Sequence, residues 1–218
     1  MIEIFYNLMG LNKHLFVSIN YYSNTGSTPY ILQTISSIFF ISNFAICYIL
    51  VCLYFCYTTL KQSNRADYFM PIYYELVRIG TCYALFGLGF AALKFSINLP
   101  RPFCSLSQEE FITIANIYSE RCLSSFPSAH TGLSILTTYC LWKYMNNILR
   151  VMSCIMIFLV AISRITLAMH YPTDILYSAL ITMFIILLAN FFYNLLKDSV
   201  IKIIGRFIMK FIFNTNSA

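Results

Sequence analysis

The chain has 218 residues, of which 59% are hydrophobic and 10% are charged, and its mean hydropathy is +0.72. A soluble domain carries about 25% charged residues, so this composition excludes a disordered chain, a disulfide-rich miniprotein and an ordinary soluble enzyme. The length suits one domain, but the apolar residues exceed what one soluble core buries. We therefore expect an all-α, polytopic membrane protein, because the apolar runs are too long for barrel strands and do not alternate.

The formal net charge is +6, from 14 Lys and Arg against 8 Asp and Glu. Such an excess can indicate nucleic acid, but no basic face with interleaved aromatic residues is present, so we expect no nucleic-acid partner. Cations that flank membrane spans explain the charge better. The eight cysteines form no C-x-x-C pair and no metal-ligand spacing, and we expect neither a metal nor a cofactor.

Residues 1–30 make a poor membrane span. Their apolar run is interrupted by Asn7, Asn12 and Lys13, and it ends in a turn-rich segment. We expect an interfacial or half-inserted helix here, or else a sixth span.

Five later stretches are long and apolar enough to cross a bilayer core, which needs about 20 residues. They are about Ile31–Leu60, Ile72–Ile97, Thr131–Asn146, Leu149–Met169 and Asp174–Leu196. In the second stretch, Glu75 and Arg78 are three residues apart, and we expect them to form an ion pair on one helix face.

The C-terminal tail, residues 197–218, carries a cation every four residues at Lys202, Arg206 and Lys210. This spacing places the three charges on one helix face. It predicts a basic amphipathic helix that lies on an anionic membrane surface.

The cations at the span ends predict the orientation. If five spans alternate, one side receives Lys61, Arg65, Lys143, Arg150, Lys197, Lys202, Arg206 and Lys210. The positive-inside rule assigns that side to the cytoplasm. The loop 98–130 and the turn 170–173 then lie on the extracytoplasmic side.

Polar and charged residues from three separate segments gather on that extracytoplasmic side. The segments carry Lys94 with Arg101-Pro102, then Pro127-Ser128-Ala129-His130, then Ser163-Arg164 with His170 and Asp174. Each has an ordinary structural explanation, such as a snorkelling lysine, a loop turn or a helix cap. Together they suit a phosphate ester, because guanidinium groups and helix N-terminal amides bind phosphate oxygens and two histidines can act as nucleophile and general acid.

These segments resemble the signature of the type 2 phosphatidic acid phosphatase (PAP2) superfamily, which reads K-x6-R-P, then P-S-G-H, then S-R-x5-H-x3-D. The spacing agrees throughout, and the resemblance extends over about residues 72–196. One position differs: Ala129 stands where the family has glycine. Alanine keeps the amide donor and is tolerated unless the position needs a positive φ.

The resemblance implies roles for the matching residues. His170 would be the nucleophile that forms a phosphohistidine, Asp174 would orient it, and His130 would protonate the leaving group and later activate water. The groups implied to hold the phosphate oxygens are Lys94, Arg101, Ser128, Ala129 and Arg164. The family needs no metal, and its members typically have six transmembrane helices.

We therefore expect the whole chain, residues 1–218, to form a single bacterial inner-membrane domain that dephosphorylates a lipid at the extracytoplasmic face. Undecaprenyl diphosphate, phosphatidylglycerol phosphate, phosphatidate and a lipid A phosphate all remain open as substrates. A lipid phosphotransferase with the same site and a non-catalytic membrane protein are the alternatives. The sequence does not predict the oligomeric state.

Cys104 and Cys122 lie in the loop assigned to the extracytoplasmic side, where disulfides persist. A bridge would close a loop of about 19 residues and contribute about 3 kcal/mol through loop-closure entropy. It would also hold Arg101 close to the helix start at Ser128. Two free thiols remain the alternative, because sequence gives no Cα–Cα distance.

Overall fold

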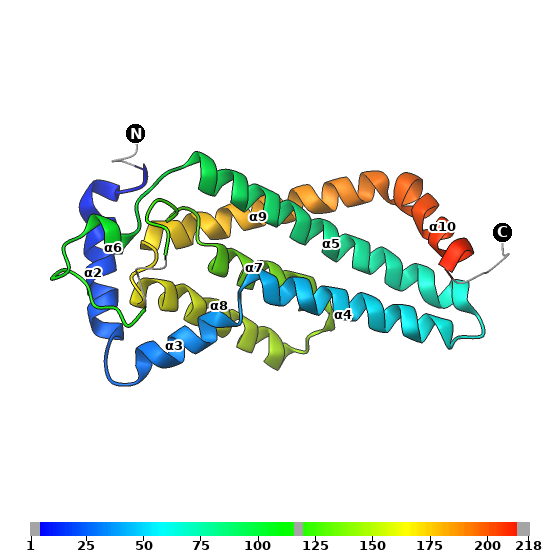
Figure 1. Ribbon diagram of the computed structural model, residues 1–218, viewed down its shortest axis with the longest axis horizontal. Coiled ribbons are helices and arrows are strands. Elements are labelled where there is room, and N and C mark those ends of the chain that lie inside the picture. Colours follow the sequence, from blue (N-terminus) through cyan, green and yellow to red (C-terminus); the bar gives the residue numbers. More distant parts are fainter. Residues whose placement is uncertain (1–4, 116–119, 213–218) are drawn as a thin grey trace. The chain divides into compact units, whose positions relative to one another are not determined.

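The computed structural model describes residues 5–115 and 120–212 of the chain. These residues form helices joined by turns and loops and include no strand, so the all-α prediction is confirmed. Figure 1 shows the helices in chain order. The elements are η1 (Leu8–Gly10), α2 (Leu11–Ser23), α3 (Thr28–Ser37), α4 (Ile41–Leu60), α5 (Arg65–Ser96), α6 (Pro102–Ser105), α7 (Ala129–Leu141), η3 (Trp142–Tyr144), α8 (Asn147–Thr166), α9 (Pro172–Leu196), the π turn η4 (Lys197–Ile201) and α10 (Lys202–Ile212).

The chain divides into two compact units, each with most of its contacts inside itself. Unit 1 comprises residues 1–41 and 87–183, and unit 2 comprises residues 42–86 and 184–218. All of the motif residues predicted from the sequence fall in unit 1.

Four helical stretches of the described chain are long and apolar enough to cross a membrane: Ile41–Leu60, Arg65–Ser96, Asn147–Thr166 and Pro172–Phe211. The predicted span 131–146 is instead α7, which has 13 residues, followed by the short turn η3. A helix of that length rises about 20 Å, less than the ~30 Å hydrocarbon core. The predicted count of five spans is therefore not confirmed.

The first predicted span, residues 31–60, is interrupted. Helix α3 ends at Ser37 and α4 begins at Ile41. The hydroxyl of Ser37 donates to the carbonyl of Thr34 (2.7 Å), and the hydroxyl of Thr34 donates to the backbone carbonyl of Tyr30 (3.0 Å). Such local bonds compete with helix continuation, and the break leaves α3 free to belong to unit 1.

Helix α2 packs against the C-terminal end of α8 through buried asparagines. Asn20 Nδ2 donates to the carbonyls of Ile165 (3.2 Å) and Thr166 (2.9 Å), and Asn12 Oδ1 accepts the amide of Thr173 (3.1 Å). Both asparagines are fully buried. Asn12, which argues against a span, and Asn20 thus satisfy backbone groups left free at the start of α9 and the end of α8, respectively. An interfacial location for this segment stays a prediction.

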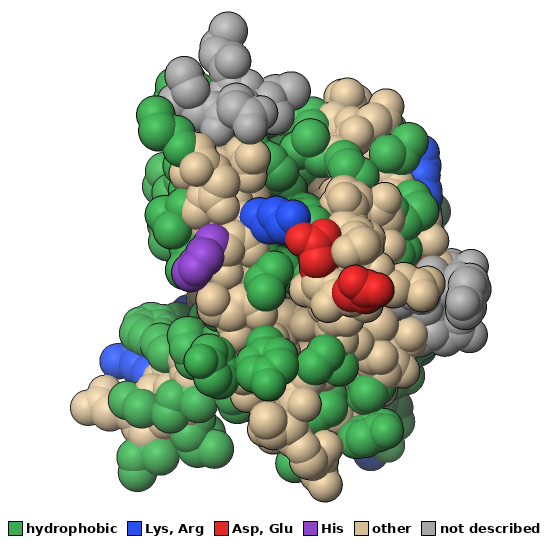
Figure 2. Space-filling view, turned by 90° about the vertical axis from the view of Figure 1, so that its left-hand side faces the viewer, with side chains coloured by type: hydrophobic (Ala, Val, Ile, Leu, Met, Phe, Trp, Pro, Cys, Tyr) green, Lys and Arg blue, Asp and Glu red, His purple; other side chains and the backbone are tan. Residues whose placement is uncertain are grey.

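The exposed face of α2 carries an ion pair with the loop that follows α6. Lys13 pairs with Glu110 at 2.5 Å, and both side chains are partly exposed. In the space-filling view of this end, basic and acidic side chains lie together near the middle of the face, with hydrophobic and uncharged surface around them (Figure 2).

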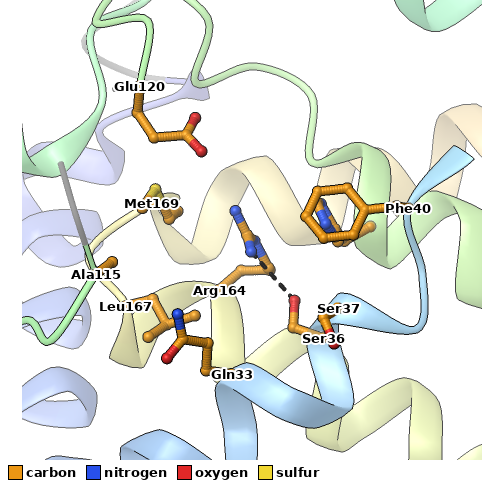
Figure 3. Close-up of a pocket in the computed structure, with 10 residues that line it drawn as sticks. Gln33, Ser36, Ser37, Phe40, Ala115, Glu120, Arg164, Leu167 and Met169 are labelled. Carbon is orange, nitrogen blue, oxygen red and sulfur yellow. Dashed lines mark hydrogen bonds between the residues drawn. The ribbon is translucent and has the colours of Figure 1, made fainter. Parts of the chain in front are cut away.

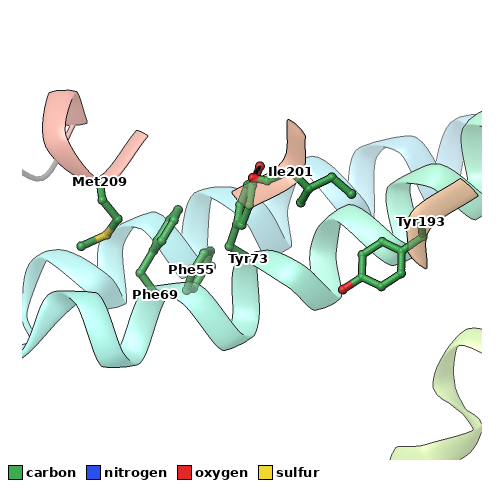
Figure 4. Packing of buried hydrophobic residues seen from close by; sticks show 6 residues of the cluster. All are labelled: Phe55, Phe69, Tyr73, Tyr193, Ile201 and Met209. Carbon is green, nitrogen blue, oxygen red and sulfur yellow. Dashed lines mark hydrogen bonds between the residues drawn. The ribbon is translucent and has the colours of Figure 1, made fainter. Parts of the chain in front are cut away.

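Unit 2 has its own core, which includes the C-terminal segment. The cluster comprises Phe55, Phe69, Tyr73, Tyr193, Ile201 and Met209 (Figure 4). The rings of Phe55, Phe69 and Tyr73 stack in a row, with centroids 5.2 and 5.3 Å apart. The predicted ion pair is also confirmed, because Arg78 Nη2 lies 2.6 Å from Glu75 Oε1.

Helix α10 packs one face against α5. At Gly205, an added Cβ would come within 2.7 Å of the Tyr73 ring. Phe207 and Phe211 remain exposed and stack on each other at 4.5 Å. The basic amphipathic helix is therefore anchored in protein along one side, and its contact with an anionic membrane surface stays a prediction.

Candidate active site

The three motif segments converge in unit 1. Arg101 Nη1 donates to Met169 Sδ (3.0 Å), which ties the first segment to the third. The Ser125 hydroxyl donates to Asp174 Oδ2 (2.5 Å), which ties the loop before the second segment to the third. The predicted residues Arg101, Ser128, Arg164, His170 and Asp174 are all buried.

A tight turn after α8 fixes Arg164 and His170 relative to each other. The carbonyl oxygen of Arg164 accepts the amides of both Met169 (3.0 Å) and His170 (3.2 Å). Within the turn Ala168 has a φ of 56°, which an L-residue with a side chain adopts only when its surroundings require it. The turn places His170 directly before the start of α9.

Asp174 lies in the first turn of α9, beside the histidine. Its Oδ2 is 3.6 Å from His170 Nδ1 and accepts the Tyr171 amide (2.9 Å) as well as the Ser125 hydroxyl. Its Oδ1 accepts the hydroxyl of Tyr6 (2.8 Å). This carboxylate is fully buried and satisfied, and it faces one nitrogen of the imidazole.

The second motif segment begins α7. Ser128 is the N-cap residue, with an extended ψ of 102°, and its hydroxyl lies 3.1 Å from Thr131 Oγ1. Ala129 is not among the described residues with positive φ, so the departure from glycine requires no strained backbone. His130 follows in the first helical turn, where free amides and the helix dipole favour an anion.

The three predicted cations are held by different partners. Lys94 Nζ donates to the Ser124 carbonyl (2.9 Å), and Arg164 Nη1 donates to the Ser36 hydroxyl (3.1 Å). Arg101 Nη1 forms an ion pair with Glu120 Oε2 at 2.8 Å. Each cation therefore has a fixed head group but keeps donors to spare.

Several buried donors at this place have no hydrogen-bond partner within the described chain. They include Arg101 Nε, Arg164 Nε and His130 Nε2, and the His170 Nδ1 atom is likewise without a hydrogen-bond partner. An unpaired buried polar group costs free energy, so a native site of this kind needs a ligand or water. Two guanidinium nitrogens and an imidazole nitrogen together call for an oxyanion.

A pocket of about 240 Å³ adjoins this cluster. Figure 3 shows Arg164 pointing into it and bonded to Ser36, with Phe40 on one side and Glu120 and Met169 across from it. The ring of Phe40 meets the ring of His130 edge-on, with centroids 4.9 Å apart. Helix α3 and the loop before α7 thus complete a wall that faces His130.

Burial and the neighbouring cations change the pKa values of both histidines. The pKa of His130 is lowered to about 2, chiefly by burial and then by Arg164. The pKa of His170 is lowered well below its usual value by the same two causes in the same order. A bound phosphate dianion cancels the charge of the cations, so it favours the protonated imidazole that an acid catalyst needs.

Cys104 and Cys122 are joined in a disulfide, with a Cα–Cα distance of 5.8 Å. Next to it, the Arg101 amide donates to the Cys122 carbonyl (2.9 Å), and the Ser125 amide donates to the Leu99 carbonyl (3.1 Å). The loop that carries Arg101 is thereby fastened to the segment that leads into α7.

The sequence did not single out five residues of this site: Tyr6, Ser36, Phe40, Glu120 and Ser125. Ser36 and Phe40 fall inside a stretch predicted to be one apolar span, so nothing marked them. Glu120 carried a usable signal, because it is a carboxylate in the loop between the first two motif segments.

Two solved structures resemble this one. The crystal structure of Aquifex aeolicus LpxE has a TM-score of 0.63 at 18% sequence identity and covers 82% of this chain and 94% of that one. A transmembrane PAP2 type phosphatidylglycerolphosphate phosphatase from Bacillus subtilis has a TM-score of 0.57 at 16% identity, with 87% of each chain covered. At these identities the likeness concerns the fold. No curated protein sequence matches the chain.

The family itself is established by sequence. Residues 75–198, more than half of the chain, match the PAP2 superfamily. This range includes every motif residue that converges in unit 1. The chain therefore belongs to the PAP2 superfamily.

Proposed function

We propose that the protein is a membrane lipid phosphatase that hydrolyses a lipid phosphate through a phosphohistidine intermediate. The observation that carries this proposal is the set of unpaired buried donors on Arg101, Arg164 and His130. They lie beside a second histidine, His170, whose Nδ1 is 3.6 Å from Oδ2 of the buried Asp174 carboxylate. An anion site next to a nucleophile and an acid catalyst is suited to phosphoryl transfer.

In the first step, His170 attacks phosphorus through Nε2, because Asp174 lies on the Nδ1 side of the ring. The bond between phosphorus and the lipid oxygen breaks, and His130 gives its Nε2 proton to that oxygen. In the second step, water attacks the phosphohistidine, its proton passes to His130, and inorganic phosphate leaves. Both imidazoles return to their starting states.

The fixed cations supply the electrostatic part of this catalysis. Lys94, Arg101 and Arg164 stabilise the charge on the equatorial oxygens of the transition state, and Ser128 with the amide of Ala129 binds a further oxygen. With three cations in these roles, we propose that the reaction needs no metal ion.

The pocket beside His130 suits the leaving group, because that histidine protonates it. Its described lining includes the polar side chains Gln33, Ser37 and Glu120, and Arg164 is the only cation among those lining residues. A second phosphate there would meet the Glu120 carboxylate. A diphosphate places its second phosphate directly on the leaving oxygen, next to Glu120. We therefore favour a monoester, such as phosphatidylglycerol phosphate, phosphatidate or a lipid A phosphate, over undecaprenyl diphosphate.

We place the enzyme in a bacterial inner membrane with the site on the extracytoplasmic side. The distribution of cations at the opposite span ends supports this orientation. The two similar structures come from bacteria, and one of them is a phosphatidylglycerolphosphate phosphatase by name, which supports a bacterial source for this protein.

The experiment is a phosphate-release assay with the purified protein in detergent micelles on the four candidate lipids, without an added acceptor. We expect release from at least one monoester and none from the His170→Ala variant. Transfer of the phosphoryl group to an added lipid acceptor, with no release of inorganic phosphate, would instead support a phosphotransferase. No turnover of any of the four lipids, with or without acceptor, would refute the proposal.

A further inference from the structure

The carboxylate of Asp174 receives a hydrogen bond from the N-terminal segment, outside the region that carries the family motifs. Tyr6 donates its hydroxyl to Oδ1 at 2.8 Å, and the two residues are 168 positions apart. Oδ2 is occupied separately, by the Ser125 hydroxyl and the Tyr171 amide. Tyr6 therefore donates to Oδ1, the carboxylate oxygen that neither Ser125 nor Tyr171 contacts.

The ring of Tyr6 is held in place by aromatic neighbours. It meets Phe126 and Tyr171 edge-on, with centroids 6.3 and 6.4 Å away. The preceding residue, Phe5, is fastened through its carbonyl oxygen, which accepts the hydroxyl of Tyr177 at 2.8 Å. Two tyrosine hydroxyls thus dock the same segment, but only one of these two bonds reaches the catalytic carboxylate.

We propose that Tyr6 is a positioning residue, which sets the orientation of Asp174 and through it the orientation of His170. This inference rests on the proposed function, because it assigns a role within that reaction. A carboxylate held by one oxygen can rotate about its Cβ–Cγ bond, whereas one held by both oxygens keeps Oδ2 toward Nδ1 of the histidine. Orientation of the nucleophile matters for rate because small misplacements are costly.

The chemistry of Tyr6 suits a permanent donor. Burial and the nearby Asp174 carboxylate raise the pKa of Tyr6 far above its ordinary value, so the hydroxyl keeps its proton at all working pH values. A hydrogen bond to a charged group is among the stronger ones in proteins. A phenylalanine at this position keeps the ring contacts and removes only that bond.

The test compares Tyr6→Phe with Tyr177→Phe, which removes the other hydroxyl that docks the segment. We expect Tyr6→Phe to lower kcat by about 10- to 100-fold, the loss of one hydrogen bond to a charged group, with KM within about 2-fold. Phosphoenzyme formation should slow by the same factor. Tyr177→Phe, which removes an exposed hydrogen bond to a neutral carbonyl, should keep kcat within about 2-fold.

A double-mutant cycle separates positioning from packing. In an Asp174→Asn background, Tyr6→Phe should cause little further loss, because the oriented carboxylate is already absent. Equal kcat values for the two single phenylalanine variants, or additive losses in the cycle, would overturn the role of Tyr6 while leaving the phosphatase intact. A wild-type protein that dephosphorylates none of the four lipids would overturn the proposed function and this inference with it.

Discussion

Glu120 forms an ion pair with Arg101, a residue that we propose binds the substrate phosphate. Its Oε2 lies 2.8 Å from Arg101 Nη1, and its side chain is 39% exposed whereas that of Arg101 is 9% exposed. A phosphate that binds Arg101 must displace this carboxylate or share the guanidinium with it. Glu120→Gln removes the competing charge at almost constant shape, so we expect tighter binding of phosphate.

The size of the effect follows from the geometry. At this distance an effective dielectric constant of 20 gives about 6 kcal/mol of Coulomb attraction, whereas exposed ion pairs contribute about 0–1 kcal/mol. Because Glu120 is more than a third exposed, solvent screens most of the attraction, and we expect about 1–2 kcal/mol. The inhibition constants of inorganic phosphate and vanadate should fall by about 5- to 30-fold.

The assay is competitive inhibition of lipid dephosphorylation in the wild type and in Glu120→Gln. The matched control is Glu110→Gln, which breaks the ion pair with Lys13 on the outer side of the same unit and should leave both constants unchanged. Unchanged or weaker inhibition in Glu120→Gln, or an equal gain in the control, would refute the reasoning.

Four other predictions follow from the site. Asp174→Asn should still bind phosphate but lose at least about 100-fold in kcat, by analogy with the carboxylate of a catalytic triad; a fully active variant would contradict this. Phosphate release should survive EDTA and be blocked by vanadate, and strict dependence on added Mg²⁺ would count against catalysis by fixed cations. Membranes prepared without reductant should show no maleimide labelling at Cys104 or Cys122 until dithiothreitol is added; labelling of both before reduction would exclude the bridge. The pKa of His130 is lowered in the folded protein, so below about pH 6.5 the unfolded chain binds more protons than the folded one. The melting temperature should therefore fall from pH 7 to pH 5, and should fall less steeply in His130→Asn. Equal slopes in the two proteins would exclude this histidine as the cause.

The convergence of the candidate site residues was predictable because these residues are chemically distinctive. Arginine, lysine and histidine are rare in apolar segments, so Lys94 and Arg164 stood out, and the spacing of their neighbours, which include Arg101, matched one family. The structure brings them together in one unit. Local sequence was sufficient here because each group sits at a helix end, where position follows from the helix boundary.

The N-terminal segment was harder to predict. Asn12 argues against a membrane span, but its role, like that of Asn20, depends on contacts more than 140 residues away. Hydropathy patterns describe a helix by itself and do not identify its partner. For the same reason the sequence predicted neither the bond from Tyr6 to Asp174 nor the break between α3 and α4.

The number of spans could not be predicted reliably, because composition does not determine where each helix ends. The apolar run at 131–146 reads as a span, but its helix ends at Leu141 and only a 3-10 turn follows. The helix at the C-terminus has the predicted period of cations, yet Ile201 and Met209 pack inside unit 2. A hydrophobic stripe does not by itself distinguish burial against protein from burial in lipid.

The central claim is that His170 carries the phosphoryl group. The direct measurement is rapid acid-free quenching of the enzyme with a radiolabelled lipid phosphate monoester, followed by proteolysis and mapping of the label. The account predicts a base-stable, acid-labile label on the peptide that contains His170, absent in His170→Ala and accumulating in His130→Ala if water attack is slowed more than formation. A label on any other residue in the wild type would contradict the account.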